Sequence, residues 1–475
     1  MNKNEIVKVN ITDLGTDGEG IGKTDGFILF VKGAVPGDEI EAHILKVKKN
    51  LGYAKIERIL SPSPDRVEPK CTAANRCGGC QIQQLSYEKQ LEIKKKKVFD
   101  CLTRIGGVDP ETLEKCYEGI IGMEEPWHYR NKAQYPVGID KDGNPRIGFY
   151  SYHSHNIIEN DECEIEKPLC ALILKELRAI ISRFDIEPYN EELGRGVLRH
   201  CLIRTGFSTG EVMVCLVVNA KGKEMNNWKA GSEPMETLVK ALKEAVDKSG
   251  FKFVSLCVNV NTKNTNVILG DKLYPVYGPT YINDMIGDVI FRISPLSFYQ
   301  VNPVQTKKLY EKALEYAELT GNETVWDLYC GIGTISLFLA KKAKKVYGVE
   351  IVPEAVENAK ENAKLNNISN AEFFCGAAED AVPRLNRELT NAERCDVIVV
   401  DPPRKGCDEK LLHTMITMDP IRIIYVSCDP ATLGRDVKFL TEHGYRLTGA
   451  CAVDQFCHSM HVETVVSLIG PRGRG

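Results

Sequence analysis

Hydrophobic positions follow two different rhythms along the chain. Near the start, apolar or alternating runs at 7–11, 26–31, 39–47 and 53–60 are separated by turns rich in Gly and Asp, which predicts a small barrel. From residue 290 onward, strand-length apolar runs alternate with helical patterns, as in a parallel sheet. We therefore expect an α/β protein with a C-terminal doubly wound, Rossmann-like sheet and an N-terminal OB-like β-barrel.

The region between these two parts has a mixed pattern. Strand-like segments occur at 146–158, 201–207, 212–219 and 255–261, and amphipathic helices are predicted at 169–184 and 235–249. The STGE turn at 208–211 joins two of these strands in a hairpin. The chain is thus expected to contain four regions: a barrel at 1–60, a cysteine-rich segment with a Lys-rich helix at 61–119, a mostly β central α+β domain at 120–290, and the doubly wound domain at 291–475.

Composition narrows the class of protein without naming a partner. The chain has 475 residues, a net charge of −4 and 17 cysteines. Its first residues lack the apolar run of a signal peptide, and no apolar stretch approaches the roughly 20 residues that span a bilayer. We expect a cytoplasmic protein whose cysteines are reduced, metal-bound or reactive. Because the net charge is slightly negative, any surface that binds nucleic acid must be local.

Three cysteines lie close together in CTAANRCGGC, at Cys71, Cys77 and Cys80. Two adjacent glycines let the backbone curl, so the three thiols can be ligands of one centre. Three clustered cysteines and a distant fourth suit a cubane iron–sulfur cluster, whereas zinc sites usually combine two pairs of ligands. Zinc and unliganded thiols stay open as alternatives. Spacing does not choose the fourth ligand among these candidates: Cys101, Cys116, Cys163 and Cys170.

The segment HYRNKAQYP, at 128–136, is a candidate contact for RNA. It combines aromatic side chains with Arg130 and Lys132, a mixture that can stack on bases and hold a nucleic-acid backbone. The alternative interpretation is the start of a surface strand with no role in binding.

Polar residues stand where the strands of the doubly wound domain end. The first of these strands leads into DLYCGIG at 327–333, a glycine turn that lacks the third glycine of a dinucleotide site because Ser336 holds that place. Glu350 ends the next strand, where a carboxylate can bind both ribose hydroxyls of a nucleoside. Asp401 ends a third strand and is held by two prolines. This combination predicts an S-adenosylmethionine site rather than an NAD or FAD site.

A cysteine ends the strand predicted at 421–426. Cys428 is followed by Asp-Pro, which forces a turn, and by itself it would be interpreted as a small buried residue. Its place among the strand ends favours a reactive thiol, because ligands of open parallel sheets bind beyond these ends. If the final strand runs antiparallel, it begins at this crevice with His461-Val462-Glu463. Glu463 would then meet Cys428, and His461 would point to the same face.

A thiol and a carboxylate beside a methyl donor suit one reaction on a pyrimidine. Carbon 5 is a poor nucleophile until a thiolate adds at carbon 6 and produces an enolate that can attack a methylsulfonium. A base must then remove the proton from carbon 5 before the thiol can leave, and a carboxylate can serve. A base within folded RNA has to swing out of its stack to reach such a crevice.

The motifs DLYCGIGT, DPPRKG, SCDP and HVETV, in this order, closely resemble those of the RNA (uracil-5-)methyltransferase family. The resemblance covers essentially the whole chain, including a start that resembles the TRAM domain. It implies that Cys428 is the nucleophile and Glu463 is the base. It further implies two sets of ligands: for S-adenosylmethionine, Gln300 (in SFYQVN), Tyr329, Glu350 and Asp401; for a 4Fe-4S cluster, Cys71, Cys77, Cys80 and, from the DEC stretch, Cys163.

The same resemblance suggests which RNA is modified. The tRNA-specific bacterial members of the family generally lack the first domain and the cluster, so the resemblance favours the subgroup that acts on 23S rRNA. A cytoplasmic monomer that binds a single-stranded or looped region with a flipped uridine is expected. One residue departs from the family pattern: Asp429 stands where Asn is usual, and an acid beside the thiol would raise the pKa of that thiol.

Two other functions fit parts of this pattern. Asp-Pro-Pro also occurs in enzymes that methylate a base nitrogen, a reaction that needs no thiol. A cluster- or metal-bearing RNA-binding or assembly factor could retain an inactive methyltransferase fold. Such a factor would have no reason to keep the thiol, the carboxylates and the glycine turn together, so methylation of uridine at carbon 5 is the leading hypothesis.

Overall fold

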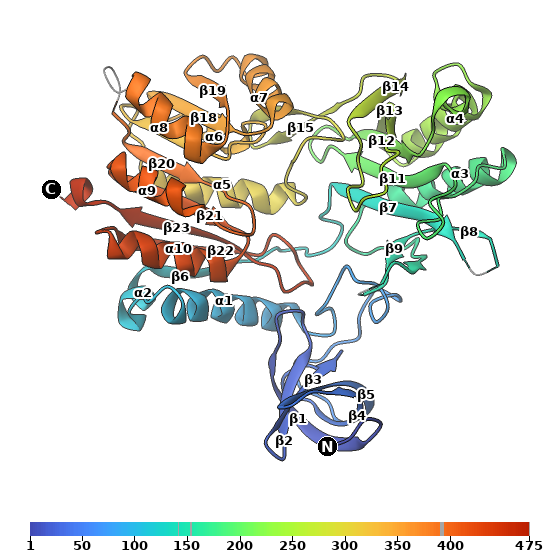
Figure 1. Cartoon of the computed structure of the whole chain (residues 1–475), viewed down its shortest axis with the longest axis horizontal. Coiled ribbons are helices and arrows are strands. Elements are labelled where there is room, and N and C mark those ends of the chain that lie inside the picture. Colours follow the sequence, from blue (N-terminus) through green and yellow to red (C-terminus); the bar gives the residue numbers. More distant parts are fainter. Residues whose placement is uncertain (141, 153, 390–393, 475) are drawn as a thin grey trace.

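The computed structural model describes residues 1–140, 142–152, 154–389 and 394–474, and it shows a small barrel attached to a larger α/β body (Figure 1). The barrel is closed in the order β1-β2-β3-β5-β4, which confirms the predicted barrel. Alternate side chains such as Val9, Leu29 and Ile40 fill it and are at most 2% exposed. Its strands are β1 (Ile6–Leu14), β2 (Gly20–Thr24), β3 (Phe27–Lys32), β4 (Glu39–Val47) and β5 (Leu51–Ser61).

The central domain is one mixed sheet with helices packed against it. The sheet has the order β14-β13-β12-β11-β7-β8. Helices α3 (Leu169–Arg183) and α4 (Glu233–Lys248) share a hydrophobic core with it. The predicted hairpin is confirmed, since β11 and β12 pair antiparallel across the STGE turn. The strands are β7 (Lys132–Ile139), β8 (Pro145–Ile147), β11 (Leu198–Thr205), β12 (Glu211–Val218), β13 (Lys252–Val260) and β14 (Lys272–Tyr277).

The single strand predicted at 146–158 is wrong. The chain there forms three short pieces, β8, β9 (Phe149–Tyr150) and β10 (Ile157–Ile158), and β9 pairs with β10; residue 153 lies outside the described residues. The cause is a close return of the backbone, because a Cβ on Gly148 would lie 2.0 Å from the carbonyl oxygen of Ile158. Only glycine permits that approach.

The C-terminal sheet has eight strands among the described residues, in the order β19-β18-β17-β20-β21-β23-β22-β6. Strands β17 to β21 run parallel, whereas β23 runs antiparallel to β21, as the sequence predicts. The doubly wound arrangement is therefore confirmed. Its parallel strands are β17 (Thr324–Leu328), β18 (Lys345–Glu350), β19 (Ala371–Cys375), β20 (Val397–Val400) and β21 (Arg422–Ser427), and β22 (Arg446–Val453) and β23 (Glu463–Ile469) complete the C-terminal part.

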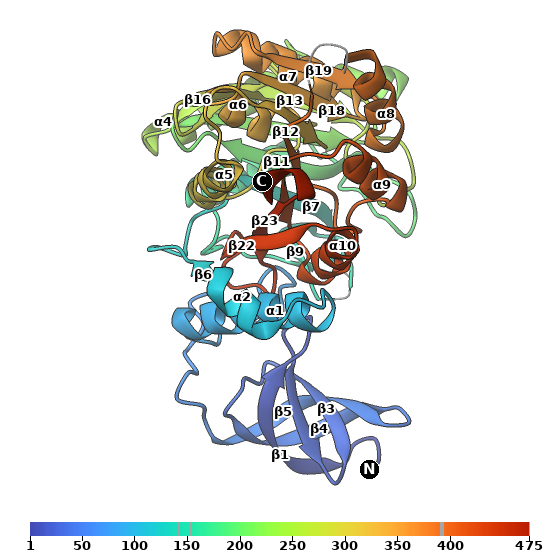
Figure 2. The same ribbon diagram turned by 90° about the vertical axis from the view of Figure 1, so that its left-hand side faces the viewer.

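Helices cover both faces of this sheet (Figures 1 and 2). One core holds α5 (Pro303–Ala317), α6 (Thr334–Ala340) and α7 (Pro353–Leu365), and the other holds α8 (Ala378–Leu389), α9 (Glu409–Thr417) and α10 (Pro430–Glu442). Successive residues of a strand point into different cores: Val325 belongs to the first core and Trp326 to the second. Such alternation follows from the pleat, and it leaves only the strand ends free to face a ligand.

An N-terminal segment completes the C-terminal body. Helix α1 (Tyr87–Arg104), whose N-cap is Ser86, and α2 (Pro110–Cys116) place Val98, Leu102 and Leu113 in the core beside α10. The following strand, β6 (Tyr117–Ile121), pairs with β22 and forms the edge of the sheet. The hairpin of β15 (Ile282–Ile286) and β16 (Val289–Ile293) joins the central domain to α5. None of the helices in the described ranges is long and apolar enough to cross a membrane.

Candidate active site

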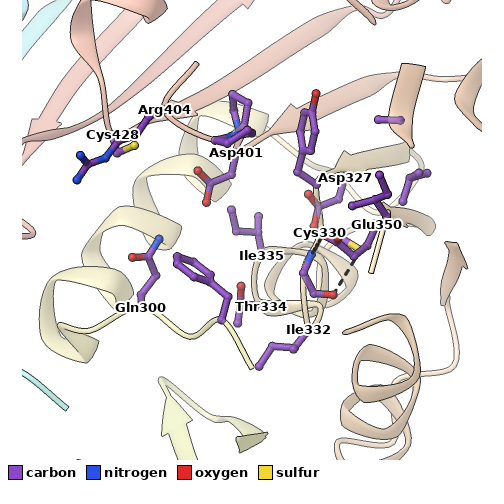
Figure 3. Close-up of a pocket in the computed structure, with 18 of the residues that line it drawn as sticks. Gln300, Asp327, Cys330, Ile332, Thr334, Ile335, Glu350, Asp401, Arg404 and Cys428 are labelled. Atoms are coloured by element: carbon purple, nitrogen blue, oxygen red, sulfur yellow. Dashed lines mark hydrogen bonds between the residues drawn. The ribbon is translucent and has the colours of Figure 1, made fainter. Parts of the chain in front are cut away.

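A cavity of about 600 Å³ opens beyond the carboxyl ends of the parallel strands. It lies where Rossmann-like sheets bind ligands and has the size of a small-molecule site. Figure 3 shows Cys428 and Arg404 at one end and Glu350 at the other, with Asp401 between them. The cavity brings together all six residues predicted for cofactor binding and catalysis: Gln300, Tyr329, Glu350, Asp401, Cys428 and Glu463.

The glycine turn forms the floor of the cavity. Tyr329, Gly331 and Gly333 have φ angles of 67°, 56° and 82°, so the chain makes a tight left-handed turn between β17 and α6. The amide of Gly331 donates to Glu350 Oε2 over 3.1 Å, and the amide of Val352 donates to Oε1 over 2.9 Å. These two bonds fix the carboxylate beside the turn, where it can accept from the hydroxyls of a ribose.

Two further carboxyl groups lie under the middle of the cavity. Asp327 is 1% exposed and accepts a hydrogen bond from the Ser336 hydroxyl, and burial raises the pKa of its carboxyl to about 7. Burial also raises the pKa of the Asp401 carboxyl. A cation in the cavity would favour the ionised form of both groups.

Cys428 and Glu463 come together through the pairing of β21 and β23. Ser427, the last residue of β21, is paired with Thr464 in the antiparallel ladder. The next position outward therefore sets Cys428 opposite Glu463, and side chains opposite each other lie on the same face. The thiol is partly exposed and the carboxyl is 2% exposed, with both lining the cavity. One oxygen of Glu463, Oε2, has no hydrogen-bond partner.

The pKa values of both groups are raised above their ordinary values. Burial first, and then the Glu463 and Asp401 carboxylates, raise the pKa of the Cys428 thiol to about 11, while the Arg404 guanidinium acts in the opposite direction. Burial, and then Asp401, raise the pKa of the Glu463 carboxyl. For both groups, burial is the largest cause of the raised pKa.

Asp429 has a structural role. Its side chain is the N-cap of α10 and accepts hydrogen bonds from the amides of Ala431, at 2.9 Å, and Thr432, at 3.0 Å. The carboxylate thus faces the start of the helix, where a negative charge is stabilised. The main causes of the raised pKa of Cys428 are burial, Glu463 and Asp401, not this neighbouring acid.

Several lining residues were not singled out from the sequence. Tyr310 comes from α5, and Phe298 and Phe456 come from loops; Phe298 is 72% exposed. Phe298 stands two residues before Gln300, and Phe456 precedes HVETV, so nearness to a motif was the only available signal. Arg404, within DPPRKG, adds a positive charge at the thiol end of the cavity.

A second cavity, of about 290 Å³, is lined by the four cysteines that the family resemblance implies: Cys71, Cys77, Cys80 and Cys163. The other three candidates, Cys101, Cys116 and Cys170, do not line it. Cys163 reaches it because the chain before α3 lies along 128–130, with the amide of Arg130 donating to Ile165 O over 3.0 Å.

The four cysteines line a cavity, and they are not gathered around a single metal-ion position. Within the described part of the chain, no three His, Cys, Asp or Glu side chains are grouped as ligands of a metal ion would be. A zinc ion needs sulfur atoms about 2.3 Å from one centre, whereas a cubane cluster holds its four cysteines at the corners of a larger body. The donor set and the cavity therefore fit a cluster better than a single zinc ion.

The segment 128–136 does not present its aromatic rings to a ligand. Tyr129 and Tyr135 are 2% and 1% exposed, so the hypothesis that they stack on bases is wrong. Arg130 and Lys132 line the four-cysteine cavity instead. The alternative of a surface strand is also wrong, because Asn131, Ala133 and Tyr135 are 3%, 4% and 1% exposed.

Comparison with solved structures defines the class of protein. The chain is similar over 97% of its length, with 29% identity and a TM-score of 0.75, to 99% of the Pyrococcus abyssi tRNA (uracil-54, C5)-methyltransferase in complex with S-adenosyl-L-homocysteine. With the cavity at the strand ends, this likeness defines an S-adenosylmethionine-dependent RNA methyltransferase.

The family follows from the sequence models. The family described as tRNA (Uracil-5-)-methyltransferase matches residues 86–470, and the TRAM domain matches residues 2–56. The chain belongs to the tRNA (uracil-5-)-methyltransferase family. Two relatives, each described as an "Uncharacterized RNA methyltransferase", are 48% identical over 468 residues in Halalkalibacterium halodurans and 49% identical over 466 residues in Bacillus cereus; the matches cover 98% of this chain and 98% and 97% of the relatives.

Proposed function

We propose that the protein methylates carbon 5 of a uridine in 23S rRNA, with Cys428 as the nucleophile and Glu463 as the base. The observation that carries the mechanism is the placement of a thiol and a buried carboxyl on adjacent strand ends, in one cavity. Methylation of a base nitrogen needs only a donor site and a polar pocket, and it would leave this pair without a purpose.

The reaction balances with these two side chains. The Cys428 thiol loses its proton to solvent, its sulfur forms a bond to carbon 6 of uracil, and the electron pair of the 5,6 double bond moves onto the carbonyl at carbon 4 as an enolate. Carbon 5 then takes the methyl group, whose bond to the sulfonium breaks with its electron pair left on that sulfur. Glu463 removes the proton from carbon 5, the double bond forms again, and sulfur leaves as thiolate. The raised pKa of Glu463 suits a general base.

The methyl donor is assigned to the other end of the cavity. S-Adenosylmethionine supplies an electrophilic methyl group on a positively charged sulfur. Glu350, already held by two backbone amides, would bind the ribose, and Asp401 would face the sulfonium side, with Gln300 and Tyr329 as walls. Glu350 and Cys428 lie at opposite ends of the cavity in Figure 3, so the donor and the base would lie between them.

We also assign a 4Fe-4S cluster to the second cavity. Cys71, Cys77, Cys80 and Cys163 would be its ligands, and Arg130 and Lys132 line the same space. Their positive charges would offset the negative charge of four thiolates, which favours the binding of a cluster.

The RNA class is the finer part of the proposal. The TRAM domain and the four-cysteine cavity support 23S rRNA, acted on by a cytoplasmic monomer that binds a looped region with its uridine flipped out. The likeness to an archaeal enzyme named for uridine 54 of tRNA makes tRNA the second candidate.

One experiment tests both substrate and chemistry. Mass spectrometry of nucleosides would map 5-methyluridine in purified 23S rRNA and tRNA from cells that lack the gene, and from cells complemented with the wild type or with Cys428→Ala. We expect one 5-methyluridine to be missing from 23S rRNA and to return only with the wild type. Loss from tRNA alone would make tRNA the substrate. Loss of a nitrogen-methylated base would refute the carbon 5 reaction.

A further inference from the structure

The catalytic cavity and the four-cysteine cavity are connected by hydrogen bonds between the segments that line them. Two loops line the catalytic cavity from the side of the central domain: residues 296–301, with Phe298 and Gln300, and residues 454–462, with Phe456 and His461 just before Glu463. Each loop is also hydrogen-bonded to a segment that lines the four-cysteine cavity.

The first loop is held by Asn131. The amide of Asn131 donates to Val301 O over 2.8 Å, and its Nδ2 donates to Gln300 O over 2.9 Å. Asn131 is 3% exposed, and its neighbours Arg130 and Lys132 line the four-cysteine cavity, as does Val301 itself. Gln300 therefore faces the catalytic cavity while the next residue faces the cysteines.

The second loop is held by Gln81, which directly follows Cys80. The amides of Gln81 and Ile82 both donate to His458 O, over 3.0 and 3.1 Å, and the amide of Met460 donates to Gln81 Oε1 over 3.3 Å. His458 is a non-glycine residue at φ 65°, a conformation that needs support from its surroundings.

Part of that support comes from residues that pack with Cys80 and Cys163. The His458 ring stacks on Trp127, with 3.9 Å between ring centroids, and its Nε2 lies 3.1 Å from Pro126 O. The Tyr129 hydroxyl donates to Cys457 O over 3.1 Å. The loop that leads to the proposed base is therefore held by Trp127 and Tyr129, which pack with Cys80 and Cys163, and also by Gln90 of α1, which accepts from the amide of His458 over 3.1 Å.

We propose that the four-cysteine site sets the geometry of the active site, through Asn131 for the donor side and Gln81 for the base side. Both are positioning residues, since neither lines the catalytic cavity. With its ligand bound, the site fixes Cys80 and the 130–132 strand, and both loops are held. When the ligand is removed or oxidised, Cys80 and the 130–132 strand are no longer fixed. The loops 296–301 and 454–462 then change position relative to each other, and with them the two sides of the catalytic cavity. The roles of the two sides follow from the proposed function.

The test measures binding and thiol reactivity, so it needs no methylation. Protein purified without oxygen is compared before and after removal of its metal with ferricyanide and EDTA. S-Adenosylhomocysteine binding is measured by calorimetry, and alkylation of Cys428 by iodoacetamide is followed by peptide mass spectrometry. We expect metal removal to weaken S-adenosylhomocysteine binding about tenfold and to change the alkylation rate of Cys428.

Matched variants separate the two connections. Asn131→Ala removes the bond from Nδ2 to Gln300 O and keeps the backbone bond to Val301 O. With its metal retained, this variant is expected to bind S-adenosylhomocysteine about tenfold more weakly and to lose little more on metal removal, because both changes weaken the same connection. Asn259→Ala is the control: it removes equally buried bonds, between Asn259 and Gly270, within the central domain. Gln81→Ala should change the alkylation rate of Cys428 and leave S-adenosylhomocysteine binding unchanged. Gln81→Glu keeps an acceptor for the Met460 amide, so its alkylation rate should equal that of wild type.

The outcomes are decisive in either direction. The proposal would be overturned if metal removal changed the S-adenosylhomocysteine affinity and the Cys428 alkylation rate of wild type by less than twofold. It would also be overturned if Asn131→Ala behaved as Asn259→Ala does, or if the purified wild-type protein contained no metal. If Asn131→Ala fails to fold, the half-buried Gln81 pair of variants still decides. The protein could also show the expected changes in S-adenosylhomocysteine binding and Cys428 alkylation on metal removal, yet not methylate uracil. That result would refute the proposed function and support this inference.

Discussion

Cys428 and Glu463 lie opposite each other one position beyond the Ser427–Thr464 pair, where β21 ends and β23 begins. Helix α10 and strand β22 separate them in the chain, so only the antiparallel return of the last strand brings them together. Cys428 lies at the end of the cavity away from Glu350 (Figure 3), and Glu463 lines the same cavity. A thiol and a carboxyl on neighbouring strand ends are held by the sheet itself, which is more rigid than a loop.

Removal of the thiol should abolish methylation without loss of cofactor binding. Cys428→Ala is expected to lower kcat by at least about 10⁴-fold, because no adduct can form, while the affinity for S-adenosylhomocysteine stays within about twofold. Transfer of labelled methyl groups to RNA and calorimetry measure the two quantities. Cys375→Ala, at an exposed cysteine on the same sheet, is the control that should stay fully active. A Cys428→Ala enzyme that still methylates would remove this residue from the mechanism.

Removal of the base should stop the reaction after the methyl transfer. In Glu463→Gln the proton on carbon 5 stays in place, so a covalent RNA–protein species should accumulate and be visible on denaturing gels, with turnover reduced about 10²- to 10⁴-fold. Absence of any adduct in this variant, under conditions where wild type turns over, would mean that another group is the base.

The same substitution should make the thiol more reactive. Glu463 is one of the groups that raise the pKa of Cys428 to about 11, so loss of its charge lowers that pKa. At pH 8 to 9, alkylation of Cys428 by iodoacetamide should be faster in Glu463→Gln than in wild type, because only the thiolate reacts. Arg404→Gln should have the opposite effect, since this guanidinium lowers the pKa. Equal rates in all three proteins would contradict the electrostatic link between these groups.

The raised pKa of Glu463 should make the folded protein less stable as pH rises. Its pKa in the folded protein is raised above the ordinary value of about 4.3, so between these two values the unfolded state binds fewer protons than the folded state. Stability therefore falls as pH rises through this window. Glu463→Gln is free of this loss, so its Tm should exceed that of wild type by more at pH 9 than at pH 5. Parallel Tm curves for the two proteins would contradict the raised pKa, and Glu442→Gln, at an exposed site, should give such parallel curves.

A buried ion pair ties α1 to the loop before Glu463. Lys94 Nζ lies 2.5 Å from Asp454 Oδ1, and both side chains are fully buried. Lys94→Met leaves a buried carboxylate without its cation and should lower the free energy of unfolding by about 3–5 kcal/mol. Thermal unfolding measures the loss, which should be smaller in the double variant Lys94→Met/Asp454→Asn. On the same helix, Lys96→Met breaks an exposed pair with Asp100 and should cost less than about 1 kcal/mol. Equal losses in the two single variants would contradict a role for burial.

The strands that hold the site were predictable because they are buried on both faces. Such strands consist of nearly continuous apolar residues, as in VIVV of β20, and a polar residue directly after them stands out. Parallel strands also place their ends at one edge, so Glu350, Asp401 and Cys428 could be assigned to one crevice without knowledge of any distance.

Other parts depend on contacts between distant segments. Strand β22, RLTGACAV, contains residues of low strand propensity, and Gly449 gives room to the ring of Tyr316, from which a Cβ would lie only 3.0 Å. Cys163 could not be chosen by spacing, because it reaches the other three cysteines through the docking of its loop on 128–130. Phe298 and Phe456 lie in loops, where periodicity carries no information.

The edge strand β6 has a consequence for the order in which the protein can fold during synthesis. It is made early, yet β22, its partner in the sheet among the described residues, is made only after strands β17 to β21. Until then the N-terminal half has a strand with no neighbour, and a C-terminal fragment that starts at residue 291 would have β22 as a bare edge, prone to aggregate. Expression of the two halves as separate polypeptides in one cell should therefore rescue a fragment that is insoluble alone.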